Sequence, residues 1–204
     1  MKKNKRNVVI CKYMVFGFFA IGLFFSDCAS SKPTREGYNI FNKYGFLFEY
    51  PEFFYITEGG LVQGQANKNS GVVTATRTIG EDAELFVITW MEMSKATVGL
   101  NHEYFTDSSL KSAIAGMVQT WGNPDQIEYG EIVQSTKEGH YYTYQQINLF
   151  LPSYDNVYLD SVAGCWYCDV GQWAFVVSYA SSISKSHQNT LMEHNQFLFN
   201  LKCH

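Results

Sequence analysis

The most informative part of this chain is its stretch Gly164-Cys165-Trp166-Tyr167-Cys168-Asp169-Val170-Gly171-Gln172-Trp173-Ala174-Phe175-Val176-Val177-Ser178-Tyr179. Two apolar runs rich in aromatic and β-branched residues flank its polar turn, Asp169 to Gln172, and this pattern predicts a central β-hairpin. Working outward from the turn, the two strands extend over Val157–Cys168 and Gln172–Ser181. The hairpin carries two of the five cysteines of the chain, so any disulfide or metal site formed by those cysteines would involve this hairpin.

Further strands are predicted where apolar residues alternate with polar ones or form short β-branched runs. The predicted strands are 46–50, a weak strand at 61–65, 72–78, 84–93, 126–137 and 140–151. Pro51 ends the first of them, because proline has no amide hydrogen for a strand ladder. Glu138-Gly139 joins the last two as a tight turn.

Two segments change to helical spacing. In 101–122, Leu110, Ile114 and Trp121 recur on one face, and Asp107 or Ser108 is placed to cap the first turn. The second helix spans Ser186 to Leu201, with a stripe formed by Leu191, His194, Leu198 and Leu201. Strands, one helix, more strands and a last helix predict an α+β domain whose central, mainly antiparallel β-sheet has helices packed on it.

The N-terminus has the pattern of an export signal. Five basic residues lie within the first twelve, and the uncharged apolar run Tyr13 to Phe25 follows. This run is shorter than the roughly 20 apolar residues of a membrane-spanning helix, so it favours a signal peptide. The alternative is an uncleaved anchor over Val8 to Phe25 with Lys12 reaching the interface. We therefore predict a signal peptide or membrane anchor at 1–28, a tether at 29–37 and one domain at 38–204.

Cys28 is the predicted lipidation site. It is followed by the small and polar residues Ala29 to Pro33, as at the junction of a bacterial lipoprotein, where the cysteine is acylated. Asp27 departs from that pattern, which has a small residue before the cysteine. Cleavage by an ordinary signal peptidase after Cys28 or Ser30 is the alternative, and the protein would then be secreted rather than attached to the cell membrane. Both alternatives place it in an extracytoplasmic compartment.

The net charge of the domain limits the kinds of macromolecule that it could bind. Ten basic and eighteen acidic residues follow Cys28, so the mature domain has a net charge near −8. Such a surface repels phosphates, and the sequence shows no basic stripe, which argues against nucleic acid as a partner.

The layout resembles the PsbP-like domains, a family of exported proteins and lipoproteins. The resemblance rests on Tyr44 to Phe54, which reads Tyr-Gly-Phe-Leu-Phe-Glu-Tyr-Pro-Glu-Phe-Phe, on the strand start Gly139 to Tyr144, and on a closing strand followed by a helix that ends near Phe197 to Leu201. It covers residues 36–204. The resemblance implies a central antiparallel sheet with helices on both faces, and a binding or assembly role without catalysis. It assigns no binding residue.

The three cysteines of the domain predict one disulfide. Along an extended strand, Cys165 and Cys168 lie roughly 10 Å apart and point to opposite faces, so they cannot pair with each other. A last helix folded over the sheet would bring Cys203 to Cys168, and we predict this disulfide with Cys165 buried and free. The alternative is an exported zinc- or thiol-dependent enzyme that uses Cys165, Cys168, Cys203 and His204, since thiolates and imidazole bind tetrahedral zinc.

Other motifs have ordinary structural interpretations. Ser108-Ser109-Leu110-Lys111 and Ser182-Ile183-Ser184-Lys185 match the Ser-x-x-Lys spacing of penicillin-binding enzymes, but the companion motifs are missing. His102-Glu103 lacks the second histidine of a zinc protease. His187 and His194 are predicted to be solvated or capping. The acidic cluster of Glu81, Asp82 and Glu84 is predicted to be a solvated turn.

Tyrosines are abundant in the predicted strands. The candidates for a shared role, all in the C-terminal third of the chain, are Tyr141, Tyr142, Tyr144, Tyr154, Tyr158, Tyr167 and Tyr179. They would either pack within the sheet or form an aromatic surface for a glycan or a partner protein. With no catalytic constellation and no cofactor motif, we expect a membrane-tethered binding or assembly module that contacts the membrane through its N-terminal segment, and an envelope protein or a glycan as its partner.

Overall fold

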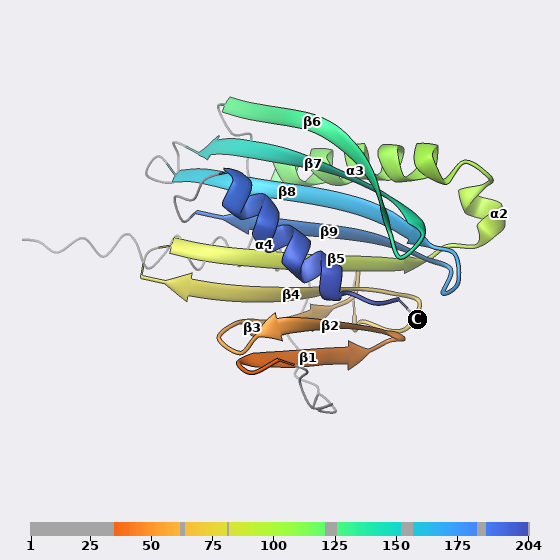
Figure 1. Ribbon diagram of the computed structural model, residues 1–204, viewed down its shortest axis with the longest axis horizontal. Coiled ribbons are helices and arrows are strands. Elements are labelled where there is room, and N and C mark those ends of the chain that lie inside the picture. Colours follow the sequence, from red (N-terminus) through yellow and green to blue (C-terminus); the bar gives the residue numbers. More distant parts are fainter. Residues whose placement is uncertain are drawn as a thin grey trace, which may run out of the picture.

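A computed structural model describes residues 35–61, 64–80, 82–120, 126–151, 157–182 and 187–203. Within these residues the chain forms nine strands and three helices (Figure 1). The strands are β1 (Tyr38–Lys43), β2 (Phe46–Pro51), β3 (Tyr55–Gly59), β4 (Ser70–Ile79), β5 (Asp82–Glu92), β6 (Gln126–Lys137), β7 (His140–Leu151), β8 (Val157–Cys168) and β9 (Trp173–Ser181). The helices are α2 (Lys95–Val98), α3 (His102–Thr120) and α4 (His187–Asn200).

The strands form two antiparallel sheets. The large sheet has the order β3-β4-β5-β9-β8-β7-β6, and the small sheet is the β1-β2 hairpin. Every neighbouring pair in the large sheet is antiparallel. The predicted β8–β9 hairpin lies at its centre, with Cys168 paired to Trp173 across the turn. The predicted α+β fold with a central antiparallel sheet is therefore confirmed.

Two hairpins close through two-residue turns with positive φ angles. The β6–β7 turn uses Glu138 (φ 52°) and Gly139 (φ 84°), and the β1–β2 turn uses Tyr44 (φ 59°) and Gly45 (φ 94°). Turns of this kind match the right-handed twist of the flanking strands and favour glycine. A Cβ atom at Gly45 would also lie 2.5 Å from the ring of Trp173, so a side chain is excluded there on both grounds.

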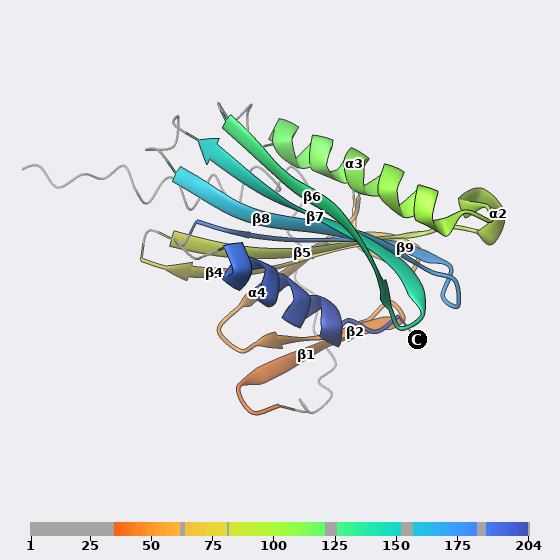
Figure 2. The same cartoon turned by 45° about the horizontal axis from the view of Figure 1, so that its top comes forward.

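Helices cover both faces of the large sheet (Figure 2). We call the two faces the α3 face, where α3 packs against β7, β8 and β9, and the α4 face, where α4 packs together with the small sheet. Because side chains alternate along a strand, β8 contributes Ala163 and Cys165 to the α3 face and Trp166 and Cys168 to the α4 face. The domain thus has two hydrophobic cores separated by the sheet.

The larger core lies on the α4 face and is mostly aromatic. Phe46 contacts the rings of Trp90 and Phe175, and Phe86 stacks on Phe197 of α4 with ring centroids 4.1 Å apart. Aromatic pairs in these arrangements contribute beyond the area that they bury. The smaller core joins Leu110, Ile114 and Met117 of α3 to apolar residues of β7 and β8. These contacts fix α3 over β7 and β8, which determines where a pocket remains.

Several predicted boundaries were wrong. The weak strand predicted at 61–65 was wrong: the strand that pairs with β4 here is β3, Tyr55–Gly59, and the Gly60 amide after it donates to the Gly64 carbonyl. Residues 62 and 63 lie outside the described residues. Helix α3 begins at His102, since Asn101 Oδ1 accepts the Tyr104 amide at 2.9 Å; neither Asp107 nor Ser108 is the cap. Strand β1 and helix α2 were not predicted. Trp121 lies outside the described residues.

Candidate functional site

A pocket of about 630 Å³ lies between α3 and the α3 face of the large sheet. Strands β5, β9 and β8 form one wall, and α3 forms the other. The lining residues, which define what we call the α3 pocket, are Val87, Thr89, Met91, Met93, Phe105, Ser108, Ser109, Ser112, Ala113, Gly116, Met117, Cys165, Ala174, Val176 and Ser178. Its volume is within the range of about 300–1,000 Å³ typical of sites for small molecules.

The pocket exists because α3 is held to one side. Its apolar stripe, Leu110, Ile114 and Met117, packs toward β7 and β8. The neighbouring stripe of α3 carries the small residues Ser112 and Gly116, which do not fill the space above β5 and β9. The sequence therefore builds a helix with one packing face and one open face.

The polar atoms in the α3 pocket are mainly hydroxyl groups. Ser108 Oγ donates to the carbonyl oxygens of Tyr104 (2.8 Å) and Phe105 (3.1 Å), and Ser112 Oγ donates to the Ser108 carbonyl (3.0 Å). Because a hydroxyl has a single hydrogen, these two serines offer lone pairs to a ligand rather than donors. Among the described residues that line the pocket, none is charged. The lining suits a neutral, largely apolar ligand.

Cys165 lies at the sheet side of the pocket and is fully buried. Burial raises the pKa of its thiol to about 12, although a hydrogen bond with Ser109 acts in the opposite direction. A thiol with this pKa stays protonated at neutral pH, and only the thiolate is a strong nucleophile or metal ligand. Cys165 is free, as predicted.

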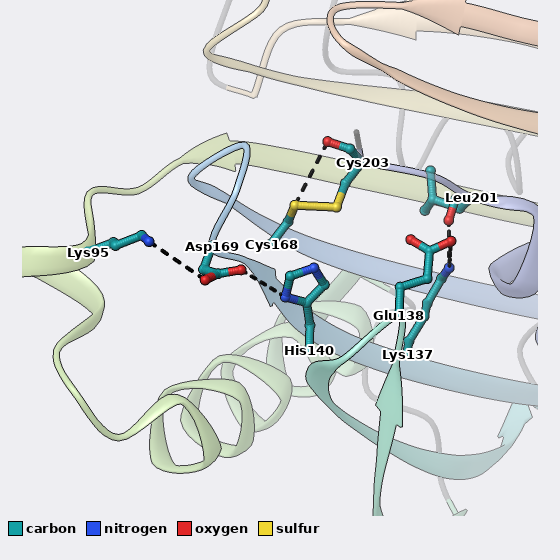
Figure 3. The surroundings of a disulfide bond; sticks show 8 residues. All are labelled: Lys95, Lys137, Glu138, His140, Cys168, Asp169, Leu201 and Cys203. Carbon is teal, nitrogen blue, oxygen red and sulfur yellow. Dashed lines mark hydrogen bonds and ion pairs between the residues drawn. A yellow bond between two sulfur atoms is a disulfide. The ribbon is translucent and has the colours of Figure 1, made fainter.

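The second group of polar residues surrounds the disulfide between Cys168 and Cys203 (Figure 3). Their Cα atoms are 6.5 Å apart, within the usual range, and the pairing is the predicted one. The last helix ends at Asn200, one residue before the predicted end at Leu201, and Lys202 pairs with Leu47 of β2 through two backbone hydrogen bonds. We call residues 201–203 the C-terminal tail.

The tail lies beside charged and titratable groups. Lys137 Nζ donates to the Leu201 carbonyl at 2.6 Å, and burial lowers the pKa of this lysine. His140 Nδ1 lies 3.1 Å from a carboxylate oxygen of Asp169, whose other oxygen lies 3.6 Å from Lys95 Nζ. These residues come from the β6–β7 turn, the β8–β9 turn and α2, which meet at one end of the sheet.

The alternative zinc or thiol site, predicted from Cys165, Cys168, Cys203 and His204, cannot form because Cys165 lies apart from the other two cysteines. Cys165 packs in the core of the α3 face, whereas Cys168 and Cys203 belong to the core of the α4 face. The sheet therefore separates Cys165 from the other two thiols, because odd and even positions of β8 point to opposite faces. His204 lies outside the described residues.

The remaining motifs have structural roles where the structure describes them. The hydroxyl of Ser108 bonds to helix carbonyls and Lys111 is exposed, so the first Ser-x-x-Lys segment forms no nucleophile–base pair; Lys185 of the second lies outside the described residues. Glu84 is buried, paired to Arg77 and bonded by the Tyr179 hydroxyl, so it is no part of a solvated turn.

One further expectation was wrong: His194 is fully buried in α4 instead of solvated. Of the two alternatives for the tyrosines, packing within the sheet is confirmed for Tyr142, Tyr167 and Tyr179, which are buried, whereas Tyr141 is 49 % exposed. The side chains of His187, Tyr154 and Tyr158 lie outside the described residues, as does Glu81.

No protein-family model matches the chain, and no curated protein matches it. The solved structures do: the solution structure of cyanobacterial PsbP (CyanoP) from Synechocystis sp. PCC 6803 superposes with a TM-score of 0.54 at 13% sequence identity, covering 86% of this chain and 98% of that one. The fold is PsbP-like. A crystal structure of a protein of unknown function from Pseudomonas aeruginosa, PA94, described as a putative regulator, gives a TM-score of 0.38 at 9% identity, covering 78% of this chain and 94% of that one.

The PsbP-like fold confirms the resemblance seen in the sequence, and at this identity it establishes architecture alone. Across the described residues no helix is long and apolar enough to cross a membrane. Cys28 and the predicted N-terminal signal lie outside those residues.

Sequence reasoning missed the α3 pocket. The available signal was the stripe of Ser108, Ser112 and Gly116 at helical spacing beside the apolar stripe, opposite the small residues Ala174 and Ser178 of β9. Small residues on two facing elements predict a gap in packing only once their juxtaposition is known.

Proposed function

We propose that this protein is a non-catalytic binding module whose ligand is a neutral, largely apolar small molecule held in the α3 pocket. The observation that carries the proposal is an uncharged lining around about 630 Å³ of space between a helix and a sheet. Pockets for small molecules are lined mainly by apolar side chains, with a few polar groups that fix orientation. Here Met91, Met93 and Phe105 supply the apolar contacts, and the α3 serines supply the polar ones.

The chemistry of the lining supports binding rather than catalysis. A nucleophile needs a base to accept its proton, or a lowered pKa. The Cys165 pKa is raised by burial, and the hydroxyl hydrogens of Ser108 and Ser112 bond to helix carbonyls. Thus, these candidate nucleophiles in the pocket lack activation.

Filling the pocket should weaken the binding of an apolar probe. We expect the neutral fluorophore N-phenyl-1-naphthylamine to brighten on binding to the protein, and Ala113→Trp to weaken that binding at least tenfold, because the indole occupies space that the ligand needs. Fluorescence titration measures both affinities.

Ala115→Trp is the matched control, because it places the same side chain on the exposed side of α3. It should leave the affinity for the probe unchanged. Equal binding by the wild type and Ala113→Trp, with both proteins folded by circular dichroism, would refute the proposal.

We also propose that the chain is exported and tethered to the membrane through its N-terminal segment. The support is the basic start, the apolar run Tyr13 to Phe25, and Cys28 with its polar tether. Mass spectrometry of the native protein should find an acylated Cys28 as the first residue. An unmodified start at Ala29 or Ser31 would exclude the lipid, and an intact Met1 would point to an uncleaved anchor.

A further inference from the structure

Three metal-binding side chains meet at the C-terminal tail. His140 begins β7, Cys168 ends β8, and Cys203 lies in the tail after α4. One ligand atom from each lies within 4.8 Å of those of the other two. The β6–β7 turn, the β8–β9 turn and the C-terminal tail place them together although they are far apart in sequence (Figure 3).

The imidazole of His140 is oriented for ligation. Its Nδ1 faces Asp169 at 3.1 Å, and Figure 3 shows the other ring nitrogen pointing toward the two sulfur atoms. A carboxylate on one ring nitrogen fixes the tautomer and raises the basicity of the other, an arrangement common among zinc-bound histidines. The side chain of His140 is only 10% exposed, so the imidazole is held in place by its surroundings.

We propose that the reduced protein binds one Zn²⁺ through Cys168, Cys203 and His140, and that this metal site and the disulfide are alternative crosslinks made by the same two sulfur atoms. Zinc prefers thiolate and imidazole ligands in a tetrahedral arrangement, with Zn–S near 2.3 Å and Zn–N near 2.0 Å, which puts its ligand atoms about 3 to 4 Å apart. Ligand atoms that already lie within 4.8 Å of one another need only small shifts to reach this geometry. Water fills the fourth position.

The exchange of crosslinks is balanced in atoms and electrons. A dithiol reductant transfers two electrons to the Cys168–Cys203 bond, which yields two protein thiols and the disulfide of the reductant. Zn²⁺ then displaces one proton from each thiol, so two protons are released and the dithiolate neutralises the charge of the ion. A disulfide oxidant takes two electrons from the two thiolates and, with two protons, becomes a dithiol; the Cys168–Cys203 bond re-forms and the Zn²⁺ ion is released.

Both crosslinks hold the same part of the fold. Either one ties the C-terminal tail to the end of β8, where Lys202 already pairs with Leu47 and Lys137 bonds to the Leu201 carbonyl. The site thus keeps the tail and α4 fixed whether the surroundings are oxidising or reducing.

The test measures zinc in the full-length protein in its two redox states. Protein reduced with a dithiol and dialysed against Zn²⁺ without oxygen should retain one equivalent by elemental analysis, and the oxidised protein should retain none. Titration of the reduced protein with Co²⁺ should give a thiolate-to-cobalt charge-transfer band. His140→Ala should weaken the affinity for zinc more than tenfold, and Asp169→Asn, a positioning variant, by about tenfold.

The matched control is Cys165→Ala, which removes a thiol from the opposite face of the sheet and should bind zinc like the wild type. Cobalt spectra remain informative if the reduced protein is partly unfolded, because metal binding then drives folding. Absence of zinc from the reduced wild type, unchanged affinity in His140→Ala, or loss of binding in Cys165→Ala would each overturn the proposal.

Discussion

Replacing Cys203 with serine should lower the free energy of unfolding of the oxidised protein by about 4 kcal/mol. The disulfide links residues 35 positions apart, and a crosslink of this span removes that much conformational free energy from the unfolded chain in the loop-entropy treatment. Serine fits the space of the thiol, so little native packing is lost. Chemical denaturation under non-reducing conditions measures the difference.

Reduction provides the control for this prediction. A dithiol in metal-free buffer should destabilise the wild type by a similar amount and leave Cys203→Ser unchanged, because the variant has no disulfide to lose. Peptide mapping without reductant should find Cys168 joined to Cys203 and Cys165 free. A loss below about 1 kcal/mol, or a Cys165–Cys203 peptide, would contradict the expected role of the bond.

Long alternating strands were predictable from the sequence. The bounds of β6, β7 and β8 were predicted to the residue. The Glu138-Gly139 turn marks the end of β6 and the start of β7, and the polar turn that begins at Asp169 marks the end of β8. The alternation also placed Cys165 and Cys168 on opposite faces, and this separation made the disulfide predictable. The sequence does not predict strand β1, because this strand pairs only within its own hairpin and carries polar residues such as Asn39 and Asn42.

The proposed zinc site and the α3 pocket could not be predicted from the sequence, because both depend on how distant segments pack together. His140 has no motif around it; it reaches the sulfur atoms because two turns and the C-terminal tail meet at one end of the sheet. The α3 pocket likewise depends on the offset of α3 toward β7 and β8, which packing decides. Periodicity predicts which face of a helix is buried, but not which strands lie beneath it.

His194 shows how one pattern can support two interpretations. Its position in the apolar stripe of the last helix predicted burial, whereas its side-chain type predicted solvation. Burial is correct, because α4 packs on the large sheet, where a hydrogen bond with the backbone of Val177 and contacts with Asn195 and Tyr142 surround the imidazole. A buried titratable group of this kind makes the stability of the fold depend on pH.

Acidification from pH 6.5 to 4 should remove about 3 kcal/mol of folding free energy through His194. Burial lowers its pKa from 6.5 to about 4 in the folded protein, against the opposing hydrogen bonds with Asn195 and Val177. Between these values the unfolded chain carries a proton on this imidazole and the native one does not, so stability falls as pH falls. Well above pH 6.5 the contribution is constant. A shift of about 2.5 units at about 1.4 kcal/mol each amounts to about 3.5 kcal/mol, of which about 3 kcal/mol is lost by pH 4, where half of the native imidazoles are protonated.

The variant His194→Leu separates this effect from the carboxylates that also titrate in acid. Denaturation midpoints measured from pH 4 to 7 should fall less steeply for His194→Leu than for the wild type, because the variant has no imidazole to protonate. Thr190→Val is the matched control: it alters a fully buried position one turn earlier on α4 without removing a titrating group, and it should keep the slope of the wild type. If the wild type and His194→Leu lose stability in parallel, His194 is protonated in the folded protein and the buried neutral imidazole is disproved.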